Sequence, residues 1–304
     1  MKRRELSIAL VVLVAIFSCS FSVFGQMTST NFQIQWDSIS AGGDDTSSSS
    51  SYILRDSVDP SSASQGSSTS YELDQGYRAG VYDRVADFEI FIESRSTQVS
   101  AISVTDTAVT VSSVSGFTVG DMVLIVEDEG ESQISAMGKI TSINVTTITV
   151  DQWHYATVMP TVGGVDDYLY NMNATVTTMP EPTPSVLATT AIGWEVTADV
   201  GDGYSVYVYE NQDLTTGTDT ITDVADGAVT VGSREYGARS SDTTLSSDFD
   251  TQDVAITSTL QQVGSRASNT FESRDFLTLK SSANGFEASG TYSHTITIIY
   301  VGDY

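Results

Sequence analysis

The chain has 304 residues, of which 39 are acidic and 13 basic, for a formal net charge of -26. This balance argues against nucleic-acid binding, which needs clustered Lys and Arg to displace phosphate counterions, and against attraction to anionic membranes. The length favours two or three domains over one small domain. Val, Ile, Thr, Ser and Tyr dominate while long helix formers are scarce, which predicts an all-β fold.

Residues 1–25 are typical of an export signal peptide. Positively charged residues precede the apolar run Leu6 to Phe17, and we expect cleavage before Gln26. Cys19 leaves lipid anchoring open as an alternative, although a bulky phenylalanine stands where a lipobox usually has a small residue. We therefore expect an extracellular or cell-surface protein with no transmembrane span after cleavage. Because Cys19 is the only cysteine, the mature fold has no disulfide framework.

Residues 26–84 form a repeat-bearing β region with serine-rich connectors. An aromatic residue followed two positions later by an aliphatic one recurs about every 20 residues, around Phe32, Tyr52 and Tyr71. The first of these strands, Gln26 to Ser40, becomes the free N-terminus after cleavage. Phe32, Ile34 and Trp36 share one face of it, as a strand donated to a neighbouring molecule requires.

Residues 85–180 are expected to form a β-domain. Val85 to Arg95 reads as a firm strand, and residues 100–153 as a small β-barrel module. Asp167 to Met179 reads as a further strand that pairs with Val85 to Arg95, which would make the barrel an insertion between neighbouring strands. Pro180, Pro182 and Pro184 then mark a linker.

Residues 185–304 are expected to form a C-terminal β-sandwich. Ala191 to Glu210 alternates apolar and polar residues on both sides of the turn Gly201 to Gly203, which predicts a β-hairpin. Its apolar face must be covered by a second sheet. The predicted architecture is therefore tandem β-sandwich and barrel domains, with a small β-barrel module in the middle.

The sequence offers no convincing catalytic set, so we do not expect an enzyme. A hydrolytic triad needs a histidine beside a nucleophile, and the only histidines, His154 and His294, read as surface or packed strand residues. Zinc sites of the usual nitrogen and sulfur kind are improbable for the same reason. Acidic residues are so numerous that paired carboxylates carry little information.

Calcium is the best ligand hypothesis. Asp248, Asp250 and Asp253 alternate in a predicted loop, and hard cations prefer several such oxygens. The EF-hand pattern fails because the required glycine is missing. A second acidic loop spans Asp219 to Asp226, and the alternative for both is a solvated loop.

Two further features have structural alternatives. Lys280 is a candidate for an isopeptide cross-link of the kind found in some surface adhesins, which would lower the intact mass by one ammonia or water. Tyr204, Tyr207 and Tyr209 would suit sugar binding on an exposed sheet, although cross-strand packing is the commoner use of such residues.

The stretches Gly193 to Val196, Asp202 to Val206 and Ser233 to Gly237 resemble secreted β-rich surface proteins of bacteria, including those of the candidate phyla. More distantly, the final domain is similar to the β-sandwiches of pilins and surface-layer modules. This resemblance implies a location rather than an activity.

We therefore expect an extracellular structural protein, a subunit of a pilus-like filament or surface layer that assembles with copies of itself by strand donation. The alternative is a monomeric adhesin or glycan-binding surface module.

Overall fold

The computed structural model describes residues 86–303 except 200 and 218, together with four short strands before them: Ser47–Ser48 (β1), Ile53–Leu54 (β2), Ser64–Ser67 (β3) and Glu72–Gln75 (β4). The chain divides into two compact units, Met1–Arg84 and Val85–Tyr304. In the first unit β1 pairs with β2 and β3 with β4, both antiparallel. The predicted signal peptide and the predicted donor residues Phe32, Ile34 and Trp36 lie outside the described residues.

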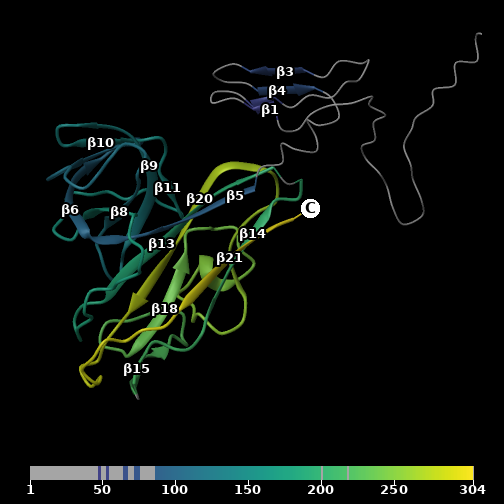
Figure 1. The fold of residues 1–304 in the computed structure, drawn as a ribbon. Helices are drawn as coiled ribbons and strands as arrows, with labels where there is room; N and C mark the ends of the chain where they lie inside the picture. The colour runs from purple at the N-terminus through teal and green to yellow at the C-terminus, as the bar shows by residue number, and fades with distance from the viewer. Residues whose placement is uncertain are drawn as a thin grey trace, which may run out of the picture. The chain divides into compact units, whose positions relative to one another are not determined.

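The second unit is built from strands, which confirms the predicted all-β class (Figure 1). Within the described part, the helical structure is a single turn of 3-10 helix, Asp248–Asp250 (η1). The strands in chain order are β5 (Ala86–Ile92), β6 (Ser94–Val104), β7 (Ala108–Val111), β8 (Met122–Glu127), β9 (Ile134–Asn144), β10 (Thr147–Val150), β11 (His154–Tyr155), β12 (Tyr168–Asn171), β13 (Ala188–Ala198), β14 (Tyr204–Glu210), β15 (Thr215–Thr216), β16 (Asp219–Thr220), β17 (Thr222–Asp223), β18 (Glu235–Ser240), β19 (Gln261–Arg266), β20 (Thr270–Ser281) and β21 (Ile296–Gly302).

Two of the sheets pack face to face as a β-sandwich. One has five strands in the order β17-β18-β20-β13-β5, and the other has three in the order β19-β14-β21. Their facing sides bury one apolar cluster, whose largest members are Trp194, Tyr204, Tyr236 and Phe249. Removal of this apolar surface from water is the main force that holds the two sheets together.

The predicted hairpin over residues 191–210 is wrong in its pairing. β13 lies in the five-stranded sheet and β14 in the three-stranded sheet, so the turn between them carries the chain from one sheet to the other. Trp194 and Val196 therefore meet Tyr204 and Val206 across the core. An alternation of period two predicts which face is apolar, but not whether the next strand pairs beside it or packs opposite it.

A closed barrel of six strands forms the second part of this unit. Its order is β10-β7-β6-β12-β8-β9, and pairing of β9 with β10 closes it. Small and branched apolar side chains fill the interior, among them Val109, Val123, Ile125, Ile148 and Leu169. The remaining strand, β11, adds to β9.

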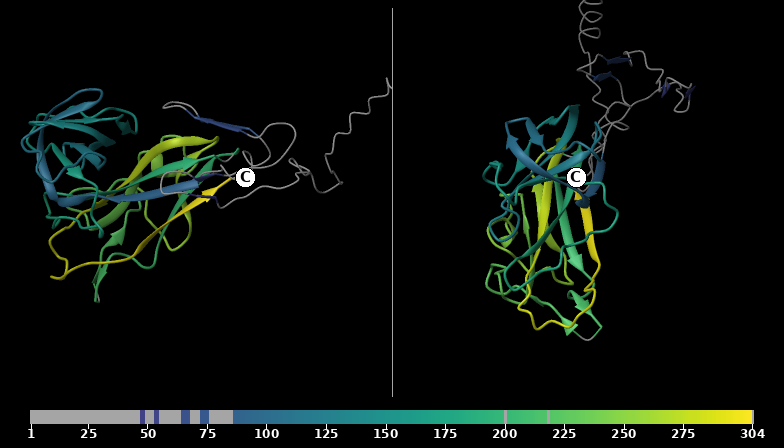
Figure 2. Two further views of the ribbon diagram at one scale, coloured as in Figure 1. Left: turned by 45° about the horizontal axis from the view of Figure 1, so that its top comes forward. Right: turned by 90° about the vertical axis from the view of Figure 1, so that its left-hand side faces the viewer.

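The domain boundaries differ from those predicted at 85–180 and 185–304. β5 pairs with β13 and belongs to the sandwich, while the chain enters the barrel directly after Glu93, at β6. The single strand predicted over Val85 to Arg95 is thus divided between two sheets (the blue segment in Figure 2). The barrel extends from β6 to β12, beyond the predicted 100–153.

The predicted pairing of Asp167 to Met179 with Val85 to Arg95 holds at only two points, where Asn171 pairs with Ser94 and Asn173 forms a bridge with Ile92. The rest of β12 pairs with β6 and β8 inside the barrel, and β5 contacts this segment further through side-chain packing of Phe91. The barrel is nevertheless inserted between two neighbouring strands, which are β5 and β13. The sandwich is therefore discontinuous in sequence.

The barrel packs on the outer face of the five-stranded sheet. Apolar side chains of β8, β9 and β12 form one buried cluster with Ala191 and Phe276 of the sandwich. At Gly193 an added Cβ atom would lie 2.4 Å from Sδ of Met137, so a glycine permits this close approach. β8 is consequently buried on both faces, toward the barrel interior and toward the sandwich.

Candidate functional site

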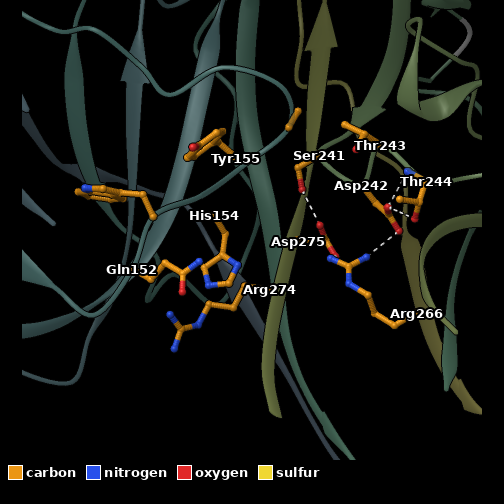
Figure 3. Close-up of a pocket in the computed structure, with 12 residues that line it drawn as sticks. Gln152, His154, Tyr155, Ser241, Asp242, Thr243, Thr244, Arg266, Arg274 and Asp275 are labelled. Carbon is orange, nitrogen blue, oxygen red and sulfur yellow. Dashed lines mark hydrogen bonds and ion pairs between the residues drawn. The ribbon is translucent and has the colours of Figure 1, made fainter. Parts of the chain in front are cut away.

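A cleft of about 300 Å³ opens between the barrel and the sandwich. Figure 3 shows Gln152, His154 and Tyr155 of the barrel on one side. Polar residues of the sandwich face them, namely Ser241, Asp242, Thr243, Thr244, Arg266 and Asp275.

Arg266 bridges two buried carboxylates at the sandwich wall of the cleft. Its Nη1 lies 3.1 Å from Oδ2 of Asp242, and its Nη2 lies 2.8 Å from Oδ2 of Asp275. Burial raises the pKa of Asp275 to about 7, against the opposing attraction of Arg266. The carboxyl of Asp275 therefore holds its proton to a higher pH than a solvated aspartate does.

The cleft brings His154, Ser241 and Asp275 into one place without joining them as a triad. Ser241 Oγ donates to Oδ1 of Asp275 at 3.2 Å and accepts the N–H of Phe276 at 2.8 Å. Among the described residues, no hydrogen bond links His154 to Ser241 or to Asp275. Burial, and then the nearby charge of Arg274, lowers the pKa of His154. A base that activates a serine must bond to it, and this pairing is missing.

Arg274 crosses from the sandwich to the barrel beside the cleft. Its side chain is almost fully buried, with Nε 2.5 Å from Oε2 of Glu195 and Nη1 2.7 Å from Oδ2 of Asp151. Lys139 of β9 lies 3.6 Å from the other oxygen of Glu195. A buried arginine is tolerated only with such partners, so these contacts fix how the barrel sits on the sheet.

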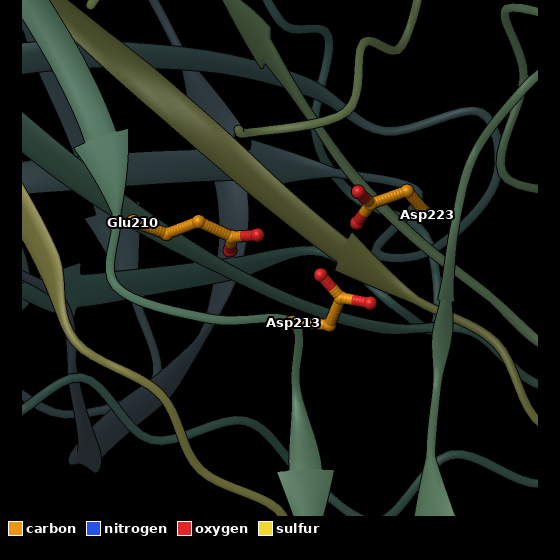
Figure 4. A group of neighbouring side chains, drawn as sticks. All are labelled: Glu210, Asp213 and Asp223. Atoms are coloured by element: carbon orange, nitrogen blue, oxygen red, sulfur yellow. The ribbon is translucent and has the colours of Figure 1, made fainter. Parts of the chain in front are cut away.

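A group of three carboxylates lies at the end of β14 (Figure 4). Oxygen atoms of Glu210, Asp213 and Asp223 fall within 4.8 Å of one another. Burial, and then the charges of Glu210 and Asp213, raises the pKa of Asp223 to about 6. His294 Nδ1 lies 2.6 Å from Oε2 of Glu210, and its Nε2 lies 3.1 Å from the Tyr236 hydroxyl. The sequence does not reveal this group, because its members come from three separate loop and strand ends.

The aspartates predicted to bind calcium do not form a ligand group of this kind. Asp248 and Asp250 lie in η1, while Asp253 is buried and its carboxylate contacts Lys280. Within the described residues, the group of three or more metal-ligating side chains is the one around Glu210. Asp219 is also separated from Asp223, since it pairs with Arg234 and Tyr292.

The tyrosines of β14 are divided by the alternation of the strand. Tyr204 points into the sandwich core, where its hydroxyl donates to Ser273 Oγ at 3.1 Å. Tyr207 and Tyr209 lie on the opposite face and are partly exposed. Tyr204 therefore serves packing rather than sugar binding.

The last candidate site is the side of the sandwich where β5 and β21 form the edges of their sheets. Among the described strands, β5 pairs only with β13, and β21 only with β14. Phe88 of β5 stacks on Tyr300 of β21 with ring centroids 5.5 Å apart. The two edges therefore lie on the same side of the core, and their inward side chains are only partly buried.

Within the described residues, β21 itself lacks three of the features that usually protect a sheet edge. Its sequence, ITIIYVG, has no charge and no proline, and its pairing with β14 has no bulge. Asn211 N–H donates to the Thr295 carbonyl and Asp303 N–H to the Gly203 carbonyl, so odd-numbered residues of β21 bond to β14. Even-numbered residues, such as Ile298, direct their backbone N–H and C=O groups away from β14.

Comparison of the chain with protein-family models, with curated proteins and with solved structures found no significant match. In the part of the chain that the structure describes, no helix has the length and apolar character needed to cross a membrane.

Proposed function

We propose that this protein is an extracellular structural subunit that assembles with copies of itself by β-strand exchange, as a filament or surface layer. The observation that carries the proposal is the edge strand β21, which has no charge, proline or bulge and lies beside partly exposed core side chains. A strand added there would continue the three-stranded sheet and cover the core on that side.

The proposed donor is the segment Gln26 to Ser40 of another copy, released by signal cleavage. Every second side chain along part of this segment is apolar, at Phe32, Ile34 and Trp36. A strand that extends the apolar layer beside Ile296 and Ile298 needs this alternation. Residues 26–36 have no charged side chain, and Asp37 is the only one in the segment, whereas the whole chain carries -26. A strand with so few acidic residues is repelled less by another copy of this acidic chain than a strongly acidic segment would be.

Peptide binding tests this proposal. A chain that lacks residues 26–40 is titrated with a synthetic peptide of that sequence, and we expect saturable binding. The matched control peptide carries Phe32→Asn, Ile34→Asn and Trp36→Asn, which keep the length and backbone donors but remove the apolar face. Equal binding of both peptides, or of neither, would contradict the donor assignment.

The alternative, a glycan-binding surface module, is favoured by the cleft. Tyr155 is 43% exposed there and stands opposite polar groups, a combination that suits a sugar ring. The test is retention of the protein on immobilised polysaccharide. Loss of retention in Tyr155→Ala, with retention kept in Val158→Ala at another exposed site, would support this alternative.

A further inference from the structure

A lysine and an aspartate lie in contact in the interior of the second unit. Nζ of Lys280 lies 3.0 Å from Oδ1 and 3.2 Å from Oδ2 of Asp253, with side-chain exposures of 10% and 6%. Lys280 belongs to β20, and Asp253 follows η1. The backbone N–H of Val229 donates to Oδ2 of Asp253 at 2.9 Å, so the carboxyl group is held in a fixed orientation.

The surroundings of this pair are buried and tightly packed. On the outer face of the sheet, Lys280 stands opposite Gly237 of β18. An added Cβ atom at Gly237 would lie 2.6 Å from Cγ1 of Val224, so the loop between β17 and β18 lies directly on the sheet. Val224 and Val229 form a small buried apolar cluster with Leu187. In such a place the two charges of an ion pair are costly, and condensation to a neutral amide would remove both.

We propose that Lys280 and Asp253 condense to form an intramolecular amide. After a proton passes from Nζ to the carboxylate, the lone pair of the neutral amine attacks Cγ of Asp253. The Nζ–Cγ bond forms, the Cγ–Oδ1 bond breaks, and Oδ1 leaves as one water molecule with two protons from the former ammonium group. Nothing is oxidised or reduced, and no co-reactant is needed.

The geometry supplies the two effects that such a step requires. The contact of 3.0 Å makes the reaction intramolecular between held groups. The N–H of Val229 stabilises the negative charge that develops on Oδ2 when Nζ attacks. The product would join the long strand β20 covalently to the segment after η1, in a chain whose one cysteine is Cys19. This inference does not depend on the proposed strand exchange.

Mass spectrometry of the purified full chain under denaturing conditions tests the inference. We expect the intact mass to be lower by one water than the mass of the same polypeptide without the amide. After trypsin digestion, the peptide that contains Asp253 is expected to remain joined to the peptide that contains Lys280, with no cleavage after Lys280. The variants Lys280→Arg and Asp253→Ala should each have the full mass of their polypeptide, without loss of water. The variant Asp253→Asn should lose one ammonia instead of one water.

Two outcomes would overturn the inference. One is a full intact mass with ordinary cleavage after Lys280. The other is a mass lower by one water with the two peptides separate, since an Asp-Gly pair such as Asp226-Gly227 can also lose water. Because the chain is denatured for the measurement, a variant that folds poorly still gives a decisive mass.

Discussion

Gly203 occupies the point where the chain passes from one sheet of the sandwich to the other. Its φ is +88°, and an added Cβ atom would lie 1.8 Å from the carbonyl oxygen of Arg266. The other glycine of this turn, Gly201, has no atom within 4 Å of its Cβ position. The two glycines therefore have different roles, although the sequence presents them as equivalent turn residues.

We expect Gly203→Ala to lower the free energy of unfolding by about 2 kcal/mol or more, because it adds a backbone clash to a left-handed conformation. Gly201→Ala should change it by less than about 0.5 kcal/mol. Urea unfolding of the two variants measures the difference. Equal loss in both would show that the turn does not follow this path.

Asp223 gives a prediction that separates protonation from ion binding. Its pKa is raised to about 6 in the folded state. Folding therefore favours its protonated form, and its contribution to stability declines as the pH rises from about 4 to about 6. Asp223→Asn should flatten this part of the melting-temperature profile, with Asp226→Asn as an exposed control.

Calcium binding stays a prediction that the same variants test. If the group around Asp223 binds the ion, excess calcium should raise the melting temperature of the unmodified chain, and Asp223→Asn should reduce that rise. If calcium raises the melting temperature of Asp223→Asn by the same amount, the ion binds at another site. If neither calcium nor a chelator changes the melting temperature, the prediction of calcium binding is contradicted.

At the scale of the elements, the position of β21 at the edge of its sheet is the feature with the clearest consequence. Ile298 directs its N–H away from β14, so proline at this position leaves the bonds to β14 intact while it removes a donor from the edge. We expect Ile298→Pro to abolish binding of the Gln26 to Ser40 peptide. Ile298→Val keeps the N–H and should bind within a few-fold of the parent. Circular dichroism checks that both variants remain folded, and binding by folded Ile298→Pro would exclude this edge.

Much of the fold at this scale could be predicted, because alternation and residue type are local signals. The all-β class, a central barrel and the buried run of β8 follow from them. The partners of each strand could not be predicted. β13 and β14 look like a hairpin because a short turn joins them, yet packing across the core placed them in opposite sheets. β5 and β6 look like one strand because the change of sheet after Glu93 leaves no proline or glycine signal.

The candidate sites, too, could be predicted as single residues but not as contacts between residues. Lys280 and Asp253 could each be selected from the sequence, but as parts of different hypotheses, since their contact depends on the loop that covers the sheet. The cleft could not be predicted, because His154 and Asp275 meet only through the docking of the barrel on the sandwich.

At the scale of the whole molecule, buried carboxyl groups and the net charge of -26 act in the same direction. Burial raises the pKa of both Glu93 and Asp275 to about 7, so the folded state retains protons that the unfolded state releases near pH 4. Stability from these groups is therefore lost as the pH rises from about 4 to about 7. The pKa values of Asp151 and Asp167 are lowered in the folded state. The ionised forms of these two groups therefore stabilise the fold, and this stabilisation is lost as the pH falls below about 4.

We therefore expect the melting temperature to be higher at about pH 5 than at about pH 8. Added salt should reduce the difference in melting temperature between these two values of pH, because salt screens the repulsion among surface charges but has little effect on the buried groups. Differential scanning calorimetry at both values of pH measures this. A higher melting temperature at the alkaline value would contradict the assignment of these raised pKa values.

Negative-stain electron microscopy of the purified chain that begins at Gln26, compared with the chain that begins after Ser40, tests the proposed assembly most directly. We predict filaments or sheets from the longer chain and isolated particles from the shorter one, with assembly inhibited when free Gln26 to Ser40 peptide is added in excess. Isolated particles from both chains, or the same assemblies from both, would contradict strand exchange through this segment.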